Sequence, residues 1–165
     1  MRKSSPPPSI DLVLIRQAIL DDLPAIRKLE QQSETAAHWA EREYDALFAP
    51  EASRRIALVA ADEAGTQQIC GFVIASCVVE EWEIENVVVA SDQRRIGVAG
   101  ALVRELVRQG SHAGAVSLGL EVRESNAAAR QLYEKLGFSE VGRRAGYYRN
   151  PIEDGLLLRI SIAVR

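Results

Sequence analysis

The clearest pattern of apolar and polar positions lies in residues 99–108, where the period is that of an α-helix. The apolar positions are Ala99, Leu102, Val103, Leu106 and Val107. Their spacing places them on one stripe of a helix, whereas Arg104, Glu105 and Arg108 face outward. The pattern predicts an amphipathic helix that packs on a core and ends at Gly110, a residue type common at helix ends.

Shorter elements are predicted along the rest of the chain. Strands are expected at residues 10–17, 55–61, 69–79, 82–89 and 117–122, with two more after Gly137. Further helices are expected after the acids and proline of residues 20–24, at residues 37–47 and at residues 126–136. A helix between strands 82–89 and 117–122 makes a crossover, which normally joins parallel strands. The order predicts a mixed α/β fold.

Composition and charge exclude several classes of protein. A chain of 165 residues can form one domain with a real core, and no apolar run is long enough to span a membrane. Residues 1–9 (MRKSSPPPS) are basic and proline-rich without the apolar stretch of a secretory signal. We therefore expect a flexible leader at 1–9, one domain at 10–165 and a cytoplasmic location. The net charge of −3 argues against direct nucleic-acid binding.

The cysteines indicate neither a disulfide nor a metal site. Cys70 and Cys77 are seven residues apart on one predicted strand, so their side chains are expected on opposite faces. His38 and His112 lie elsewhere in the sequence and complete no recognisable ligand set. No metal is expected.

The stretch RRIGVAGALV (94–103) joins a predicted strand to the amphipathic helix. Amide groups at a helix start lack partners within the helix and attract anions, and Gly97 and Ala99 keep large side chains away. The stretch fits neither a Walker A loop nor the GxGxxG pattern. From these residues alone, a phosphate-binding loop and a basic solvated turn both remain open.

Three motifs resemble one family. Residues 94–99 (RRIGVA) resemble the R/Q-x-x-G-x-G/A motif of the GNAT N-acetyltransferases. Residues 120–138 and 143–154 resemble the ribosomal-protein-alanine N-acetyltransferase (RimI) branch of that family. The resemblance covers about residues 80–160. It implies the GNAT fold: a mostly antiparallel sheet of about seven strands, one parallel pair splayed around acetyl-CoA, and about four flanking helices.

The resemblance also implies how acetyl-CoA binds. The expected cofactor residues are Val87, Val88, Val89, Arg94, Arg95, Ile96, Gly97, Val98, Ala99, Gly100 and Asn126. The three valines would hold the pantetheine arm and the acetyl carbonyl through backbone hydrogen bonds. The loop that follows would bind the diphosphate, and Asn126 would contact coenzyme A.

Glu121 and Tyr133 are the candidate catalytic pair. Glu121 lies where a predicted strand ends, a position at which ligands gather in open sheets. Asn126 suits the start of the next helix, and Tyr133 lies seven residues further on the same helical face. The resemblance implies Glu121 as base and Tyr133 as acid. The residue types alone are equally compatible with a solvated glutamate and a tyrosine that packs on the sheet.

Four further residues are candidates for the acceptor site. Glu83 and Glu85 alternate on one predicted strand face, where they would bind the acceptor amine or provide the base. Such alternation is also typical of an exposed face. Tyr147 and Tyr148 lie near the turn between the last two strands, which borders the peptide-binding groove in the RimI pattern. They are otherwise ordinary strand aromatics.

The function expected from this resemblance is acetylation of a protein N-terminal α-amine, with the N-terminal alanine of a small-subunit ribosomal protein preferred. Direct attack in a ternary complex is expected because no motif places a nucleophile. Acetylation of a small-molecule amine, or acetyl-CoA binding without turnover, remain the alternatives. Two departures from the branch pattern are His38-Trp39 in place of an aromatic-Pro-Trp element, and Gly155 where alanine is usual.

Overall fold

The computed structural model describes residues 10, 13–49, 54–62 and 68–163. The predicted leader at 1–9 and most of the hairpin loop near Gly65 lie outside the described residues. Within the described residues, no helix is both long and apolar enough to cross a membrane.

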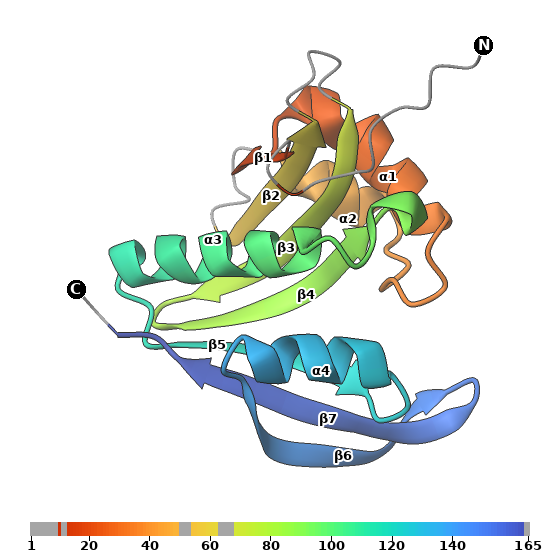
Figure 1. The fold of residues 1–165 in the computed structure, drawn as a ribbon, viewed down its shortest axis with the longest axis vertical. Helices are drawn as coiled ribbons and strands as arrows, with labels where there is room; N and C mark the ends of the chain where they lie inside the picture. The colour runs from red at the N-terminus through yellow and green to blue at the C-terminus, as the bar shows by residue number, and fades with distance from the viewer. Residues whose placement is uncertain (1–9, 11–12, 50–53, 63–67, 164–165) are drawn as a thin grey trace.

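One sheet of seven strands runs through the molecule in the order β1-β2-β3-β4-β5-β7-β6 (Figure 1). The strands are β1 (Val13–Gln17), β2 (Arg55–Asp62), β3 (Ile69–Val78), β4 (Glu81–Val89), β5 (Ser117–Arg123), β6 (Ser139–Arg149) and β7 (Ile152–Ser161). Neighbours pair antiparallel except β4 and β5, which are parallel. The predicted crossover and its parallel pair are confirmed.

The parallel pair separates before either strand ends. Pairing runs from Glu81 opposite Ser117 to Ile84 opposite Leu120, yet β4 continues to Val89 and β5 to Arg123. The register of β4 against β3 shifts at the same point, so that Glu85 is an extra residue without a partner. Such a bulge bends its strand. The two strands therefore diverge and leave an opening between their carboxyl ends.

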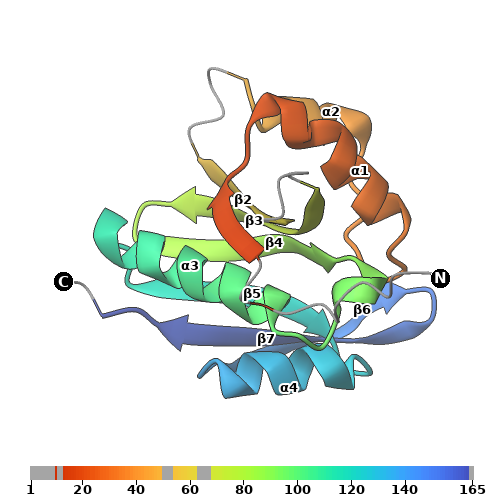
Figure 2. The same ribbon diagram turned by 45° about the horizontal axis from the view of Figure 1, so that its top comes forward.

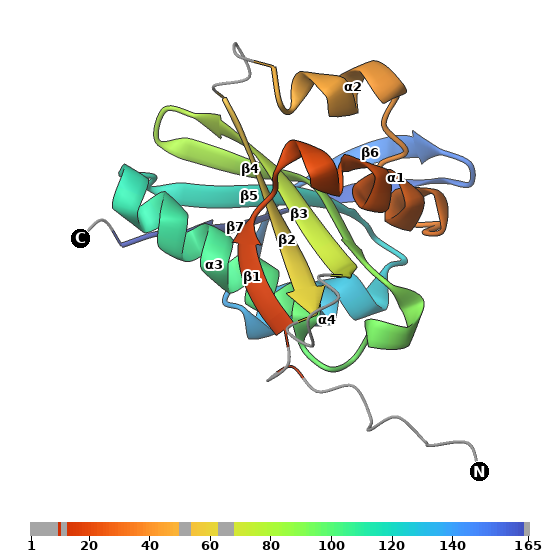
Figure 3. The same ribbon diagram turned by 90° about the horizontal axis from the view of Figure 1, so that it is seen from above.

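Helices cover the two faces of the sheet in pairs. α1 (Leu23–Gln31) and α2 (Glu41–Ala46) lie on one face, and α3 (Val98–Ala113) and α4 (Ala127–Lys135) on the other (Figures 2 and 3). Each face has its own core cluster. Leu102, Leu106, Leu118 and Tyr133 belong to the cluster under α3 and α4, whereas Ile26, Tyr44, Phe72 and Ile74 belong to the one under α1 and α2. Short 3₁₀ turns in the described part of the chain include η2 (Leu20–Asp22) and η3 (Ser91–Gln93).

The prediction that Gly110 ends the central helix was wrong. α3 continues to Ala113, and Gly114 with φ of 83° forms the C-cap. A Cβ on Gly110 would lie 3.2 Å from Ile162 Cδ1 and 3.4 Å from Trp82 Cε3. Gly110 therefore allows the helix to pack closely on the sheet. Its backbone is helical and does not end the helix.

The predicted helix at 37–47 is shorter than expected. α2 begins at Glu41, because side chains of neighbouring elements bind the preceding amides: Ala37 N donates to Asn86 Oδ1 (3.4 Å) and Trp39 N to Glu30 Oε1 (3.0 Å). His38 between them has φ of 52° in the left-handed region. These amides therefore anchor a loop.

Cys70 and Cys77 are both free, as expected, but they do not face opposite ways. Ala61 pairs with Ile69 and Ala60 with Gly71, so Cys70 is the extra residue at this register shift. Both sulfur-bearing side chains pack against the same core cluster. The shift cancels the alternation on which the prediction depended.

Replacing Gly110 by leucine should destabilise the fold by about 2 kcal/mol or more, because the added side chain has no room against Ile162 and Trp82. Urea unfolding followed by circular dichroism measures the change. Ala113→Leu on the exposed last turn of the same helix is the matched control and should alter stability by less than about 0.5 kcal/mol. Equal stability of the two variants would contradict the packing role of Gly110.

Candidate functional site

The loop before α3 exposes unpaired backbone amides. Gly97 is the N-cap with φ of 98°, and a Cβ there would meet no atom within 4 Å, so the backbone conformation and not the space requires glycine. No side chain caps the helix, and its first hydrogen bond runs from Ala101 N to Gly97 O (2.9 Å). The amides of residues 98–100 therefore lack partners in the helix. Together with the helix dipole they form an anion-binding site.

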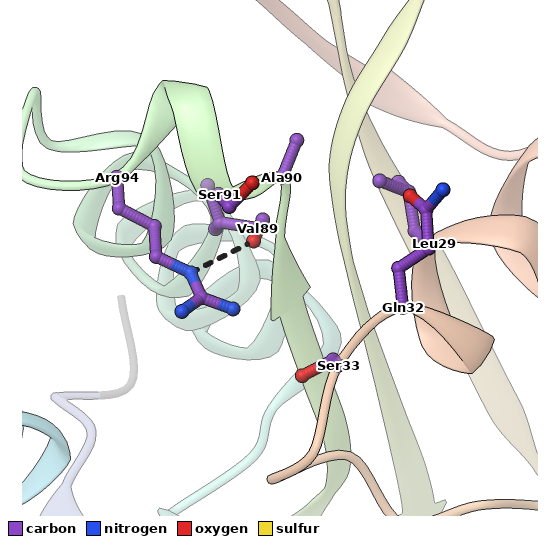
Figure 4. A pocket seen from close by; sticks show the side chains of 7 residues that line it. All are labelled: Leu29, Gln32, Ser33, Val89, Ala90, Ser91 and Arg94. Carbon is purple, nitrogen blue, oxygen red and sulfur yellow. Dashed lines mark hydrogen bonds between the residues drawn. The ribbon is translucent and has the colours of Figure 1, made fainter.

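Arginines surround this helix start. Arg94 Nε donates to Val89 O (3.2 Å), which ties the loop to the end of β4 (Figure 4). The other guanidinium nitrogens of Arg94, and all those of Arg95, have no partner among the described residues and are exposed. Arg104 was expected to face solvent, but its side chain extends toward the start of the helix and lies over Gly100. A Cβ placed on Gly100 would be 3.3 Å from Arg104 Nη1. A cation over Gly100 is a contribution that the helical pattern did not reveal.

The end of β4 turns backbone groups toward the opening. Ala90 N donates to Cys70 O of β3 (2.8 Å). Because successive residues of a strand direct their backbone groups to alternate sides, Val89 and Val87 direct theirs away from β3. The bond from Arg94 to Val89 O agrees with this direction. Side chains of Leu29, Gln32 and Ser33 at the end of α1 face this part of β4 across a small pocket (Figure 4).

Glu121 is the first residue of β5 beyond the paired region. Its side chain is only 12% exposed; Oε2 lies 3.2 Å from Arg144 Nη1, and Oε1 is buried without a hydrogen-bond partner among the described residues. Burial raises the pKa of this carboxyl, the charge of Arg144 lowers it, and the charge of Glu83 raises it. The net rise makes Glu121 a stronger base than an exposed glutamate.

Tyr133 lies inside the core cluster under α3 and α4, with its ring 5.3 Å from that of Phe138. Burial raises the pKa of Tyr133 to about 12, so the phenol is protonated at neutral pH and able to donate. Asn126 is the N-cap of α4 as predicted, where its Oδ1 accepts a hydrogen bond from Ala129 N (3.2 Å). Its side-chain NH₂ has no partner among the described residues.

Glu121 and Tyr133 lie on opposite faces of the sheet. Leu120 and Val122 of β5 belong to the same core cluster as Tyr133. Side chains alternate along a strand, so Glu121, which lies between them, points to the face of α1 and α2. Glu121 therefore lies on the face opposite to the core that contains Tyr133, and the two residues do not share one surface.

The structure distinguishes Glu83 from Glu85. Glu85, the bulge residue, accepts two hydrogen bonds from Arg55 (2.7 and 2.9 Å), and Arg55 in turn lies 5.1 Å from the ring centre of Trp39. Glu83 is exposed and forms no ion pair among the described residues, while its charge acts on Glu121. Of the two acids, Glu83 is therefore the one that no ion pair holds in place among the described residues.

The two tyrosines of β6 adjoin Glu121 through arginines. Their rings meet edge to face at 5.1 Å; Arg144 lies 5.4 Å from the ring centre of Tyr147, and Arg123 lies 4.1 Å from that of Tyr148. Burial raises the pKa of Tyr148, and the charge of Glu121 raises it further. The tip of the β6–β7 hairpin therefore borders the same face as Glu121. Sequence reasoning missed Arg144, because only the fold brings it to β5.

A buried polar network was also missed. Asn86 Nδ2 donates to Glu30 Oε1 (2.9 Å) and to Tyr44 Oη (3.4 Å), and all three side chains are buried. The network joins α1 and α2 to β4 directly after the bulge. A polar amide directly before the apolar run VVV (87–89) was the signal that the sequence offered.

Among the described residues, no group of three or more His, Cys, Asp or Glu side chains is placed to hold a metal ion.

Comparison with known proteins points to one family. Residues 23–138 match the acetyltransferase (GNAT) family. The [ribosomal protein bS18]-alanine N-acetyltransferases of Salmonella typhimurium and Escherichia coli K12 are each 34% identical, over 87% of this chain and 93% of theirs. The crystal structure of the Escherichia coli ribosomal-protein-S18-alanine N-acetyltransferase superposes with a TM-score of 0.79 at 30% identity, over 93% of this chain and 96% of that one.

A more distant structure shares the fold alone. Arabidopsis thaliana NAA60 in complex with acetyl-CoA superposes with a TM-score of 0.81 at 19% identity, over 91% of this chain and 98% of that one.

Reversing the charge of both Arg94 and Arg95 to glutamate should weaken acetyl-CoA binding by about tenfold or more, because the variant replaces two cations beside the unpaired amides by two anions. Calorimetric titration with acetyl-CoA measures the affinity. Arg108→Glu, on the exposed side of the same helix, is the control and should bind like the unchanged protein. Full affinity in the double variant would show that the diphosphate binds elsewhere.

Proposed function

The chain belongs to the acetyltransferase (GNAT) family and is an acetyl-CoA-dependent N-acetyltransferase, and we propose that its acceptor is the N-terminal α-amine of a protein. The preferred acceptor is the N-terminal alanine of ribosomal protein bS18 or a similar N-terminus. The supporting observation is that two [ribosomal protein bS18]-alanine N-acetyltransferases are 34% identical to this chain over 87% of its length. Modification of a ribosomal protein would take place in the cytoplasm.

The residues that would hold acetyl-CoA lie at the end of the central strand β4, at the start of α3 and at the start of α4. The amides of residues 98–100, with Arg94 and Arg95 beside them, suit the diphosphate. Backbone groups of Val87 and Val89 suit the pantetheine amides and the acetyl carbonyl, and the free NH₂ of Asn126 is a further donor. Acetyl-CoA supplies a thioester whose carbonyl carbon the amine attacks, so that a C–N bond forms and the C–S bond breaks.

Glu121 and Tyr133 would perform the two proton transfers that this exchange requires. Glu121 would take one proton from the attacking ammonium, directly or through water, and Tyr133 would give one to the departing sulfur. The proposal is supported by the position of Glu121, largely buried and with a raised pKa where β5 leaves β4, and by that of Tyr133 on the other face of the sheet. In the tetrahedral intermediate the nitrogen and the sulfur are different substituents of one carbon, so a base and an acid would have to reach it from different directions. Glu83 would assist by attracting the ammonium group.

The acceptor class follows from how much basicity the site must supply. An α-amine has a pKa of ~7.7–8.0 and a lysine side chain ~10.4. Near neutral pH, roughly a tenth to a third of α-amines are therefore neutral, against about one lysine in a thousand. One largely buried carboxylate whose pKa is raised suits the α-amine. A lysine acceptor would require a base about three pKa units more effective.

Glu121→Gln should lower kcat by about 10²-fold or more, because amide nitrogen and oxygen accept no proton at neutral pH. Tyr133→Phe should do the same by removing the donor. Neither variant should change the KM for acetyl-CoA by more than about twofold.

In the unchanged enzyme kcat/KM should rise as pH rises through the pKa of Glu121, since the base acts when deprotonated, and Glu121→Gln should abolish this rise. Glu134→Gln on the exposed side of α4 is the control.

Unchanged kcat in both Glu121→Gln and Tyr133→Phe would exclude the pair from the mechanism.

Acceptor choice can be measured with peptides. A peptide that begins Ala-Arg should be acetylated at its N-terminus, whereas the same peptide with a blocked N-terminus and one internal lysine should react at least about 100-fold more slowly, because the lysine is almost wholly protonated. Mass spectrometry locates the acetyl group. Preference for spermidine over the peptide would indicate a small-molecule enzyme. Tight acetyl-CoA binding with no acceptor in a broad amine panel would indicate a non-catalytic module.

A further inference from the structure

The carboxylate of Glu153 in β7 accepts hydrogen bonds from the end of β5 and from the loop that follows it. Oε1 accepts from Arg123 Nη1 (2.9 Å) and from Ser125 Oγ (3.0 Å), and Oε2 accepts from Ser125 N (2.9 Å). The side chain is only 15% exposed. Arg123, followed by Ser125, lowers the pKa of this carboxyl, so the carboxylate is charged at neutral pH. One largely buried charge thus holds the loop to β7.

The register of the strands explains this placement. β5 and β7 pair as far as Arg123 opposite Gly155. Glu153 precedes Gly155 by two residues, so it lies level with Ser125, just beyond the end of β5. The side chain of Glu153 therefore continues a connection that the backbone pairing no longer makes.

On the side of the carrier, this connection reaches the start of α4. Ser125 directly precedes Asn126, whose backbone N donates to Arg123 O (3.0 Å) and whose Oδ1 accepts from Ala129 N at the start of the helix (3.2 Å). The side-chain NH₂ of Asn126 is the group proposed to contact coenzyme A. Its position depends on a loop that Glu153 holds at the adjacent residue.

On the side of the acceptor, the same connection reaches Tyr148. Glu153 and Tyr148 are direct partners in the pairing of β7 with β6. The Arg123 guanidinium, which Glu153 binds, lies 4.1 Å from the centre of the Tyr148 ring, a distance at which a cation attracts the ring face. The position of an aromatic residue beside Glu121 therefore also depends on Glu153.

We propose that Glu153 is a positioning residue that fixes Asn126 through Ser125 and Tyr148 through Arg123. The inference rests on the proposed function, in which Asn126 contacts coenzyme A and Tyr148 borders the acceptor. Glu153 acts through these neighbours and takes no part in the proton transfers. One carboxylate at the end of β5 would thereby set the geometry of both binding sites.

Glu153→Gln tests this role, because glutamine keeps the shape of the side chain but not its two accepting oxygens. Donors surround the carboxylate, so the NH₂ of glutamine must face either Ser125 N or Arg123. The KM for acetyl-CoA and the KM for a peptide that begins Ala-Arg should each rise about fivefold. At saturation kcat should change less than about twofold, because other contacts hold Glu121 and Tyr133.

A matched control lies on the neighbouring strand. Glu140 is exposed on β6, with its carboxylate 3.9 Å from Arg143 Nε. Glu140→Gln should leave both KM values unchanged. The tip of the β6–β7 hairpin should survive in Glu153→Gln, since Asp154 still accepts hydrogen bonds from Gly146 N (2.9 Å) and Arg143 Nη1 (3.1 Å).

Two further variants separate the two routes. Asn126→Ser keeps an oxygen that caps the helix but removes the NH₂, so it should raise only the KM for acetyl-CoA. Arg123→Met removes the cation beside Tyr148 and should raise only the KM for the peptide. Adding Glu153→Gln to Asn126→Ser should raise the KM for acetyl-CoA no further while still raising that for the peptide, and the reverse should hold when Glu153→Gln is added to Arg123→Met.

Unchanged KM values for both substrates in Glu153→Gln would overturn the inference. A rise in the KM for acetyl-CoA as large in the Asn126→Ser background as in the unchanged enzyme would show general loosening of the fold, and would overturn it too. Failure of the proposed acceptor would appear separately, as an absence of peptide acetylation by the unchanged enzyme. Calorimetric titration with acetyl-CoA would still test the route through Asn126, because Glu153→Gln should weaken binding about fivefold and full affinity would contradict it.

Discussion

Backbone groups that lose their strand partner must find another, and this requirement organises the whole site. β4 keeps β3 and β5 keeps β7 along their lengths, but each loses its other neighbour after Ile84 and Leu120. The start of α3, a few residues beyond β4, adds amides that no cap satisfies. Two sets of unpaired backbone groups thus face one narrow region. In the proposed function, the amides and the diphosphate of acetyl-CoA would satisfy both sets.

The bulge at Glu85 links this opening to the face of the sheet that α1 and α2 cover. By inserting one residue it changes which β4 side chains face α1 and α2, and so brings Asn86 into the core beneath these helices. Asn86 then needs partners, which Glu30 and Tyr44 supply. The divergence of the strands and the attachment of α1 and α2 therefore have a common origin in one inserted residue.

The sequence predicted those features that depend on local periodicity or on a contiguous motif. The stripe of α3, the crossover to a parallel strand and the cap at Asn126 follow from spacing within a few residues. Features that depend on contact between distant segments were not predictable. A glycine such as Gly110 can either end a helix or allow close packing, here against Ile162, and the sequence does not distinguish the two roles. Cys70 changes face because the pairing of β3 with β2 shifts by one residue at that point. Arg144 meets Glu121 only because β7 brings β6 beside β5.

The separation of β4 and β5 has a consequence for the order of events in the proposed reaction. Leu120 and Val122 of β5 join the core under α3 and α4, whereas Glu121 between them, the first residue beyond the pairing with β4, lies on the face of α1 and α2. A carrier bound at the start of α3 and a polypeptide end bound beside Glu121 would therefore occupy opposite faces of the sheet. Neither would have to leave before the other could be exchanged.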